Sequence, residues 1–415
     1  MLLDYGKDQI KLKIPEGVKF QMVSGTFQPP LNNPEQEIIY AIRSPIGCPP
    51  LSEIIDPGDK VCILVNDSTR VARSEIFLPV LIDELDGIGI KDKDMFIVFT
   101  NGTHRALSKT EMKDLVGNYV ASKIALYNHD SRNDDELVYY GTTSFDTPVY
   151  INSRVAKADK RILTGSVVQH YFAGYGGGRK ALVPGAAGWK TIEKNHSLML
   201  DEKAAGGILN GNPVHEDLLE AALMVGGNFL INTVLDEEKA ILGIYAGDMI
   251  DAHLAACKAA DKVYNVEINQ LAEVVIASCG GYPKDINLYQ AHKTLDNALN
   301  AMRPGGNLIL LAECEEGMGS TTFKEWTLKY CSLQELRRAI TNNFVLGGHK
   351  AYTISNLLRK GTVYLVSRLD KDLSRALGFI PVEDLDEALA AVYKKTRELL
   401  TYVIPQGAIY RPILK

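Results

Sequence analysis

Short runs of apolar residues recur along the chain, and several of them stop at a cluster of polar residues or glycines. Continuous apolar runs of about four to eight residues are typical of strands buried on both faces of a parallel sheet. The runs predict strands at residues 60–66, 94–100, 124–128, 149–152, 161–165, 273–278, 307–312 and 362–366. Alternation of polar and apolar positions at 9–14 predicts a short β-rich entry within residues 1–45.

Helical stretches separate these strands. The pattern predicts helices at residues 75–85, 249–260, 287–302, 349–359 and 383–399. Ser108 and Glu111 have the spacing of a capping box, which predicts that a further helix begins there. Strands and helices in alternation favour an α/β fold with mainly parallel sheets and right-handed crossovers.

The length of the chain predicts more than one domain. At 415 residues it exceeds what a single hydrophobic core usually supports, so we expect two. The stretch 261–270 is polar and aperiodic, and we place the boundary there. The expected organisation is an α/β domain at 1–265 and a second α/β domain at 266–401, with the tail 402–415 returning to pack on the first.

Composition and charge narrow the range of partners. The chain is 46% hydrophobic and 23% charged with a net charge of -6, so neither nucleic acid nor an anionic membrane is expected, and small metabolites are favoured. The first residues lack the apolar core of a signal peptide, and no run approaches the roughly 18 apolar residues of a membrane span. Six cysteines are scattered without a CxxC pair. This pattern favours free thiols in a reducing compartment, so we expect a cytoplasmic protein.

Unusual polar clusters follow four of the predicted strands. They are DSTR at 67–70, NGTHR at 101–105, the glycine-rich segment 165–180 and CGGYPKD at 279–285. Ligands of open α/β sheets bind beyond the carboxyl ends of the strands, so these clusters predict one site in a cleft between the two domains. His104, His170 and His196 each have an ordinary structural explanation as loop or helix histidines, but three in one kind of location favour a chemical role.

The segment GYGGGRK at 174–180 permits several interpretations. A P-loop would need Ser or Thr after the lysine, and Ala181 stands there. Gly176, Gly178 and Ala181 satisfy the dinucleotide pattern GxGxxA, but no clear strand precedes them. Glycine amides together with Arg179 and Lys180 can still line an anionic group.

Carboxylate binding has candidates in both predicted domains. The guanidinium of Arg70, at the end of a strand, can engage both oxygens of a carboxylate. Tyr289, Gln290 and Lys293 lie at a predicted helix start, where the last two share one helical face. A solvated polar helix end explains these residues equally well.

Taken in order and with their intervals, DSTR, NGTHR, HYFAGYGGGRKALVPG, KNHSL and GGYPKDINLYQAHK resemble the nickel-dependent lactate racemase family over nearly the whole chain. The resemblance implies two α/β domains with the active site between them, the first binding the cofactor and the second contributing substrate-binding residues. It also implies a nickel-pincer nucleotide, a pyridinium mononucleotide that binds nickel through sulfur, carbon and sulfur. The enzymes that synthesise this cofactor are then expected partners.

Residue roles follow from the same motifs. The resemblance implies that Lys180 forms a thioamide link to the cofactor and that His196 is the protein's nickel ligand. His104 and His170 would be the acid/base pair. The remaining implied contacts are Asp67, Gly176, Gly177 and Gly178 toward the cofactor, and Arg70, Tyr289, Gln290 and Lys293 toward the substrate.

The implied function is a racemase or epimerase of 2-hydroxy acids, such as lactate, that works by reversible hydride transfer through a 2-keto acid. Removing hydride avoids a carbanion next to a carboxylate, and two histidines suit proton transfer near neutral pH. His349 and Lys350 favour malate or a sugar acid as alternative substrates if they reach the site. A non-catalytic protein that binds the nickel nucleotide is a further alternative, and a nicotinamide-dependent dehydrogenase a third.

Overall fold

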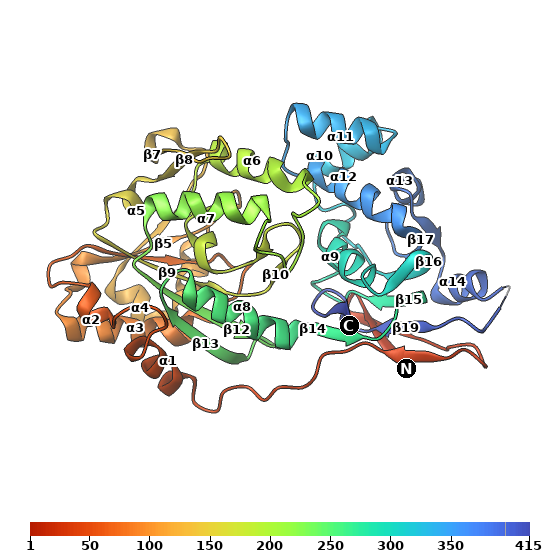
Figure 1. Ribbon diagram of the computed structural model, residues 1–415, viewed down its shortest axis with the longest axis horizontal. Coiled ribbons are helices and arrows are strands. Elements are labelled where there is room, and N and C mark those ends of the chain that lie inside the picture. The colour runs from red at the N-terminus through yellow and green to blue at the C-terminus, as the bar shows by residue number, and fades with distance from the viewer. Residues whose placement is uncertain (395) are drawn as a thin grey trace. The chain divides into compact units, whose positions relative to one another are not determined.

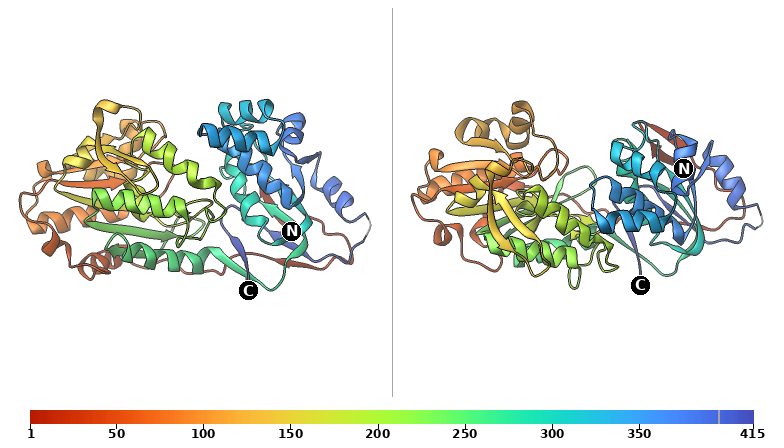
Figure 2. Two further views of the ribbon diagram at one scale, coloured as in Figure 1. Left: turned by 45° about the horizontal axis from the view of Figure 1, so that its top comes forward. Right: turned by 90° about the horizontal axis from the view of Figure 1, so that it is seen from above.

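The computed structural model describes residues 1–394 and 396–415. The chain forms two compact units, which we call the central unit, residues 27–263, and the terminal unit, residues 1–26 with 264–415. Figure 1 labels their helices and strands, and the further views in Figure 2 show strands flanked by helices in both units. An α/β fold with mainly parallel sheets, as predicted, is confirmed.

A six-stranded sheet in the order β13-β12-β9-β4-β5-β6 forms the middle of the central unit. Its strands are β4 (Val61–Val65), β5 (Met95–Phe99), β6 (Ala125–Asn128), β9 (Lys160–Ser166), β12 (Phe229–Leu235) and β13 (Ile241–Gly247). All neighbours pair in parallel except β12 and β13, which are antiparallel. Parallel pairing brings the carboxyl ends of β9, β4 and β5 to the same edge.

Two short antiparallel hairpins accompany this sheet, β7 (Leu137–Thr142) with β8 (Pro148–Asn152) and β10 (Gln169–His170) with β11 (Gly174–Tyr175). The helices of the unit are α1 (Pro34–Arg43), α2 (Leu51–Ile54), α3 (Ser74–Ile88), η1 (Asp92–Asp94), α4 (Lys109–Lys123), η2 (Asp134–Glu136), α5 (Ser153–Lys157), η3 (Gly178–Ala181), α6 (Trp189–Ser197), η4 (Leu198–Leu200), α7 (Pro213–Val225) and α8 (Asp251–Tyr264). Helices α1, α3 and α4 bury their apolar residues against one face of the sheet. The predicted capping box of Ser108 and Glu111 opens α4.

The terminal unit has its own six-stranded sheet, in the order β18-β17-β16-β15-β19-β3, with every neighbouring pair parallel. Its strands are β3 (Phe20–Met22), β15 (Ala272–Ser278), β16 (Met302–Leu311), β17 (Gly361–Val366), β18 (Ile380–Val382) and β19 (Thr401–Ile404). Successive residues of β15 face opposite cores: Val275 and Ala277 belong to one hydrophobic cluster, and Val274 and Ile276 to the other. This alternation explains why the strand reads as a continuous apolar run.

Helices and two further strand pairs complete the terminal unit. The pairs are β1 (Leu2–Tyr5) with β2 (Asp8–Lys11), and β14 (Asn265–Ile268) with β20 (Arg411–Leu414). The helices are α9 (Leu288–Ala298), α10 (Thr321–Lys329), α11 (Leu333–Asn342), α12 (Gly348–Leu357), η5 (Leu358–Lys360), α13 (Lys371–Leu377) and α14 (Leu385–Val392).

The chain ends do not follow the expected domain organisation. Residues 1–26 fold with the terminal unit, because β3 adds an edge strand to β19 and the β1–β2 hairpin buries Leu3 and Leu12 in its core. The tail also belongs to the terminal unit, where β19 lies between β15 and β3 and β20 pairs with β14. Residues 402–415 and residues 1–26, both of which we expected to belong with the first domain, thus fold together in the terminal unit.

Three predicted helices have different bounds. The helix expected at 287–302 ends at Ala298, because the chain is already extended in β16 from Met302. The helix expected at 249–260 continues to Tyr264 and leads into β14, so part of the polar stretch 261–270 is regular structure. The helix expected at 383–399 is confined to Leu385–Val392, and position 395 of that prediction lies outside the described residues.

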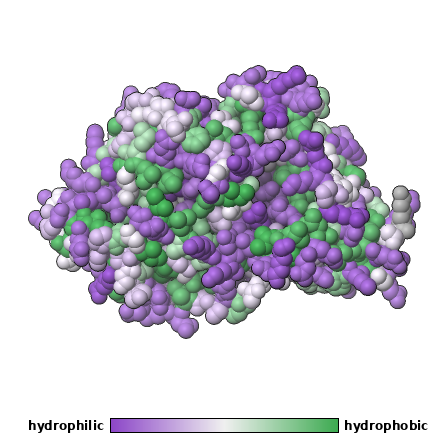
Figure 3. All heavy atoms as spheres, in the orientation of Figure 1, coloured by the Kyte–Doolittle hydropathy of each residue, from purple (hydrophilic) through white to green (hydrophobic). Residues whose placement is uncertain are grey.

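The surface is mixed in character. On the face shown in Figure 3, hydrophilic residues predominate and hydrophobic residues are interspersed among them. Among the helices of the described residues, none combines the length and the apolar character that crossing a membrane requires.

Candidate active site

The candidate site is assembled at the carboxyl ends of three adjacent strands of the central unit. Asp67 and Arg70 follow β4, His104 follows β5, and β9 leads into the β10–β11 hairpin and η3, which carry His170 and Lys180. His196 lies near the end of α6. Most of the sequence-predicted site residues therefore come from one unit.

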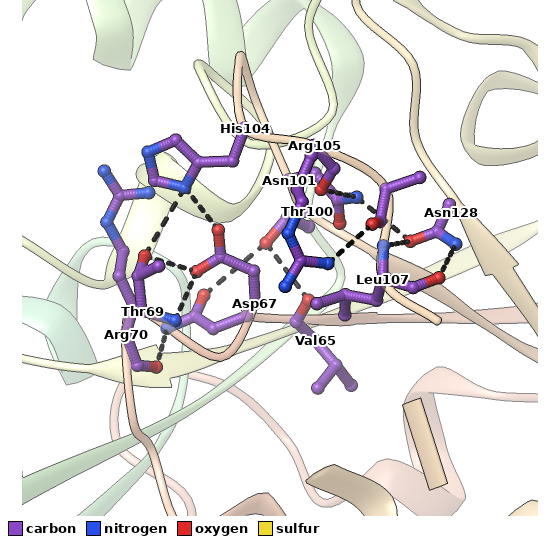
Figure 4. Close-up of polar contacts among 12 residues, drawn as sticks. Val65, Asp67, Thr69, Arg70, Thr100, Asn101, His104, Arg105, Leu107 and Asn128 are labelled. Atoms are coloured by element: carbon purple, nitrogen blue, oxygen red, sulfur yellow. Dashed lines mark hydrogen bonds and ion pairs between the residues drawn. The ribbon is translucent and has the colours of Figure 1, made fainter. Parts of the chain in front are cut away.

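Asp67 and His104 form the best-defined contact of the site (Figure 4). The Nδ1 of His104 donates a short hydrogen bond to Oδ2 of Asp67, which is buried while His104 is exposed. Oδ1 of Asp67 accepts from the backbone N–H of Thr69 at 3.1 Å and from its hydroxyl at 2.7 Å. Burial would raise the pKa of Asp67, but the bonds from His104 and Thr69 and the charge of Arg70 hold it below its usual value.

This contact determines which ring nitrogen of His104 is reactive. Because the Asp67 carboxylate only accepts hydrogen bonds, the His104 proton lies on Nδ1 in the neutral ring, and Nε2 carries the free electron pair. The loop behind the ring is fixed by Asn101, whose side-chain amide donates to the carbonyl of Arg105 at 3.2 Å and to Asn128 at 3.0 Å (Figure 4). His104 is thereby oriented as a proton acceptor.

The surroundings of Lys180 and His196 lower the pKa of both side chains. Burial, followed by the charges of Arg70 and Arg179, lowers the pKa of Lys180 well below its usual value. Burial, followed by the charges of Lys180 and Arg70, lowers the pKa of His196 to about 3. A lowered pKa favours the neutral amine, which is a nucleophile, and the neutral imidazole, which is a metal ligand.

His170 differs from His104 in its hydrogen bonding. The backbone N–H of Ala173 donates to Nδ1 of His170 at 3.3 Å, so the proton of the neutral ring lies on Nε2. The buried ring of Phe172 connects two of the histidines, since its centroid lies 4.6 Å from that of His170 and 5.0 Å from that of His196. His170 and His196 therefore share one local environment.

The glycine loop is packed tightly against the protein. Gly177 and Gly178 have φ values of 70° and 55°, in the left-handed region that favours glycine. A Cβ on Gly177 would lie 2.7 Å from Oδ1 of Asn232, and one on Gly178 would lie 2.6 Å from the ring of His253. The need for glycine at these two positions is thus explained by contacts within the chain.

Arg179 turns inward from this loop. It is 1% exposed, and its guanidinium donates to the carbonyls of Ala173 at 2.8 Å and Tyr175 at 3.2 Å. We expected Arg179 to line an anionic group together with Lys180. Its side chain instead holds the segment that connects His170 to the glycines.

Tyr289, Gln290 and Lys293 lie together on α9, in the terminal unit. The Lys293 amine donates to Oε1 of Gln290 at 3.0 Å, as expected for residues three apart on one helix. The amine of Lys350 lies 4.6 Å from the centroid of the Tyr289 ring. Three of the four predicted substrate-binding residues thus lie on one helix, whereas Arg70 belongs to the central unit.

Sequence reasoning missed two fully buried polar residues, Asn195, which contacts His196, and Asp217, which accepts from Asn195. Asn195 lies within the KNH motif, so its position beside the histidine was an available signal. Asp217 is one acidic residue in the amphipathic helix α7, and nothing in its local sequence distinguishes it. Within the described part of the chain, no group of three or more His, Cys, Asp or Glu side chains is placed to hold a metal ion.

Comparisons with known proteins cover both units. The profile of the lactate racemase N-terminal domain matches residues 5–207, and that of the lactate racemase C-terminal domain matches residues 267–409. The chain is 30% identical to the lactate racemase of Thermoanaerobacterium thermosaccharolyticum over 93% of its own length and 92% of the relative's. It is 32% identical to the lactate racemase of Lactiplantibacillus plantarum over 90% of each chain.

Solved structures agree with these matches. The lactate racemase apoprotein from Thermoanaerobacterium thermosaccharolyticum superposes with a TM-score of 0.89 at 28% identity and covers 99% of both chains. A protein from Thermotoga maritima shares the fold, with a TM-score of 0.67 at 17% identity over 92% of this chain and 98% of that one. The chain therefore belongs to the lactate racemase family and is an isomerase of the racemase type.

Proposed function

We propose that the protein interconverts the enantiomers of a 2-hydroxy acid, lactate or a close relative of it, by reversible hydride transfer with a nickel-pincer nucleotide as cofactor. The observation that carries the proposal is the pairing of Asp67 with His104 at the strand ends that also carry Arg70 and lead to Lys180. Both curated relatives bear the name lactate racemase, which supports the choice of substrate.

The residues present fit the cofactor. Lys180 offers an amine whose pKa is lowered and which could form a thioamide, and His196 offers an imidazole that could bind nickel. Lys180 would hold the nucleotide and His196 would hold the nickel. When bound, the nucleotide supplies an acceptor that takes a hydride from the substrate carbon and returns it.

Proton transfer falls to the protein. His104 receives the hydroxyl proton of the substrate at Nε2, and Asp67 stabilises the imidazolium that results. Arg70, which carries a permanent charge near Asp67, Lys180 and His196, holds the substrate carboxylate. Loss of the proton and the hydride leaves a planar 2-keto acid.

His170 completes the inversion. Its proton lies on Nε2, so it returns a proton to the keto oxygen when hydride is delivered to the other face of the reoriented keto acid. The two histidines exchange roles when the opposite enantiomer enters. Gln290, Lys293 and Tyr289 are proposed to bind the substrate carboxylate as well.

Racemisation in deuterated water tests the mechanism. Cofactor-loaded protein is incubated separately with D-lactate and L-lactate, and the enantiomers and their deuterium content are measured by chiral chromatography with mass spectrometry. We expect an equal mixture from either enantiomer with no deuterium at the α-carbon, because a transferred hydride does not exchange with solvent. Incorporation of solvent deuterium would favour proton abstraction and contradict the hydride route.

His104→Asn and His170→Asn distinguish an enzyme from a protein that only binds the nucleotide. Each variant is expected to lower kcat by about 10²- to 10⁴-fold while it keeps the cofactor, because general acid/base groups contribute on that scale. Intact mass and nickel content of each preparation report the cofactor. Wild-type protein that carries the cofactor and racemises no 2-hydroxy acid would support the binding protein instead.

The substrate panel includes malate and a sugar acid. His349 and Lys350, which we linked to a second polar group on the substrate, are 1% and 2% exposed, and Lys350 contacts Nδ1 of His292 at 3.1 Å. Their enclosure within the terminal unit supports lactate ahead of the larger acids. Faster turnover of malate than of lactate would reverse this order.

A further inference from the structure

The carboxyl group of Asp217 is completely buried and accepts three hydrogen bonds from uncharged groups. Its Oδ1 accepts from the hydroxyl of Thr143 at 2.6 Å, and its Oδ2 accepts from the hydroxyl of Thr147 at 2.9 Å and from Nδ2 of Asn195 at 2.8 Å. Burying a carboxyl group costs free energy unless hydrogen bonds replace those lost to water. Of the three hydrogen bonds to Asp217, the one from Asn195 lies nearest to the candidate site.

Two acceptors fix the side-chain amide of Asn195. Its Nδ2 donates both to Asp217 and, at 3.1 Å, to the backbone carbonyl of Val214. Because neither acceptor can donate, the amide cannot rotate by half a turn without losing both bonds. Its oxygen must therefore point the other way, and it lies 3.2 Å from Nδ1 of His196.

The amide oxygen in turn selects the form of the His196 ring. A carbonyl oxygen only accepts, so Nδ1 of His196 must carry the proton to form this contact. In the neutral ring the electron pair then lies on Nε2. Metal-bound histidines commonly use their second ring nitrogen in this way, to donate to a polar partner that fixes the ring.

We propose that Asp217 is a positioning residue that acts through Asn195 to hold His196 with its proton on Nδ1 and its metal-binding electron pair on Nε2. The inference rests on the proposed role of His196 as the nickel ligand. It adds to that role a chain of hydrogen bonds from Asp217 on α7 through Asn195 to His196 on α6, which we call the relay. The relay is formed by the protein alone.

Further hydrogen bonds connect both helices of the relay, α6 and α7, to the β7–β8 hairpin. Thr143 and Thr147 lie in the turn of the β7–β8 hairpin, so Asp217 connects this hairpin to α7. The hydroxyl of Thr191, on α6, donates to the carbonyl of Pro148 at 2.6 Å, which connects the same hairpin to α6. Helix α6 is thus anchored at Thr191 and at Asn195, and the ring of His196 has a rigid support.

The ring form of His196 can be measured in the cofactor-free protein. Protein labelled with ¹⁵N in its histidine rings is analysed by long-range ¹H–¹⁵N correlation, and His196→Gln identifies the His196 signals. We expect the proton on Nδ1 in the wild type and a shift toward protonated Nε2 in Asn195→Leu and in Asp217→Leu. A wild-type proton on Nε2, or no change in Asn195→Leu, would overturn the proposal.

A swapped pair separates the relay from general stability. Asn195→Asp places two carboxyl groups face to face. Their repulsion is expected to turn the side chain at position 195 away from Asp217, so that the Nδ1 proton of His196 loses its fixed acceptor. The Asn195→Asp/Asp217→Asn double variant restores it, because the carboxyl group at position 195 accepts from His196 and from the new amide. Failure of the double variant to recover the proton on Nδ1, while it remains folded by circular dichroism, contradicts the relay.

Asn152→Leu is the matched control. Asn152 is also a buried asparagine whose amide contacts a histidine, Nδ1 of His129 at 3.3 Å, but it does not touch His196. It should lose comparable stability and leave the His196 signals unchanged. An equal change of those signals in the control would assign the effect to loosened packing and overturn the proposal.

Nickel retention gives the second readout. Cofactor-loaded Asn195→Leu and Asp217→Leu are expected to bind nickel about 10- to 100-fold more weakly than wild type, as measured by metal analysis after dialysis against a chelator. Wild-type retention in both variants would overturn the link to the metal. A wild type that binds no nickel nucleotide would refute the proposed function, whereas the ring measurement on cofactor-free protein decides the relay independently.

Discussion

Asp67 shows how one residue can be buried and yet stay ionised. Desolvation favours the neutral acid, but His104 and Thr69 donate to both of its oxygens and Arg70 adds a positive charge, so its pKa remains below the usual value. An ionised Asp67 can only accept from His104. The protonation state of one carboxyl group thereby decides which nitrogen of the neighbouring ring can take a proton.

Asp67→Asn tests this dependence. The backbone N–H of Thr69 can only donate, so the new amide oxygen should keep that place and turn the amide nitrogen toward Nδ1 of His104. His104 would then carry its proton on Nε2 and could no longer accept one. We expect kcat to fall by about 10²- to 10⁴-fold with the nickel content unchanged, measured as initial racemisation rates. A kcat near that of wild type would contradict the role given to Asp67.

The reactive residues of the candidate site were accessible to sequence reasoning, but their supports were not. His104, His170, Lys180 and His196 stand within dense motifs of glycines and polar residues after strands. The direction of a side chain is not visible in such a motif, and we expected Arg179 to point toward an anion when it is in fact buried. Asp217 acquires its hydrogen-bond partners only in the folded chain, because Thr143 and Thr147 in the β7–β8 turn are distant from it in sequence. A local sequence pattern therefore could not identify it.

At the scale of elements, the glycine loop is held by contacts that leave no space for a side chain. Gly178→Ala should cost about 1–2 kcal/mol for the left-handed backbone, and about 1–3 kcal/mol more because its Cβ would overlap the His253 ring. Gly317→Ala is the matched control, with φ at 65° and no atom within 4 Å of its Cβ. Urea unfolding measures both. Equal losses would show that the contact with His253 contributes nothing.

Two buried histidines near this loop make the folded protein less stable at acidic pH. Burial, followed by the charge of Arg179, lowers the pKa values of His215 and His253 to about 3. Their unfolded pKa is about 6.5, so below that pH the unfolded chain binds protons that the folded chain does not. Stability is complete above about pH 6.5 and falls toward pH 3, by up to about 1.4 kcal/mol per pH unit for each histidine.

His253→Gln should make this loss less steep. Glutamine can still donate to the carbonyl of Gly176, as His253 does at 2.8 Å, but it does not titrate. The free energy of unfolding, measured in urea at pH 7.5 and at pH 5.5, should therefore fall less in the variant than in wild type. The same loss in both proteins would mean that His253 takes up its proton at the same pH in the folded and in the unfolded chain.

The buried strands were predicted more accurately than the partly exposed strands and the helix ends. Buried parallel strands such as β4 and β5 are apolar at every position, β15 is apolar from Val274 to Ala277, and their predictions are confirmed. The β7–β8 hairpin was seen only in its second half, and β7 has no fully buried residue. The end of α9 was overestimated because Leu299 and residues 301–302 are apolar while the chain leaves the helix.

At the scale of the whole molecule, the sequence predicted two α/β units but not which unit receives the chain ends. The first residues carry no local signal of their partner, because β3 pairs with β19 from the opposite end of the chain. The same holds for β20, whose partner β14 follows α8. Pairing between such distant strands depends on the complete fold, and a sequence pattern read locally cannot reveal it.

Leu3→Ala tests the place of the first residues in the terminal unit. Leu3 is 1% exposed within the hydrophobic cluster that also contains Val274 and Ile276, whereas its neighbour Leu2 is 60% exposed. We expect Leu3→Ala to cost about 2–5 kcal/mol, and Leu2→Ala to stay within about 0.5 kcal/mol of wild type. Hydrogen exchange should locate the loss in the terminal unit. Faster exchange confined to the central unit would contradict the assignment of residues 1–26.

The pairing of β3 with β19 also determines the order in which the two units can finish folding during synthesis. A ribosome releases β3 long before β19, and at about 5–20 residues per second tens of seconds separate the two. The central unit can fold during that interval, because its whole sequence emerges before β19. The sheet of the terminal unit can add β3 only after β19 has been synthesised, so this unit is completed last.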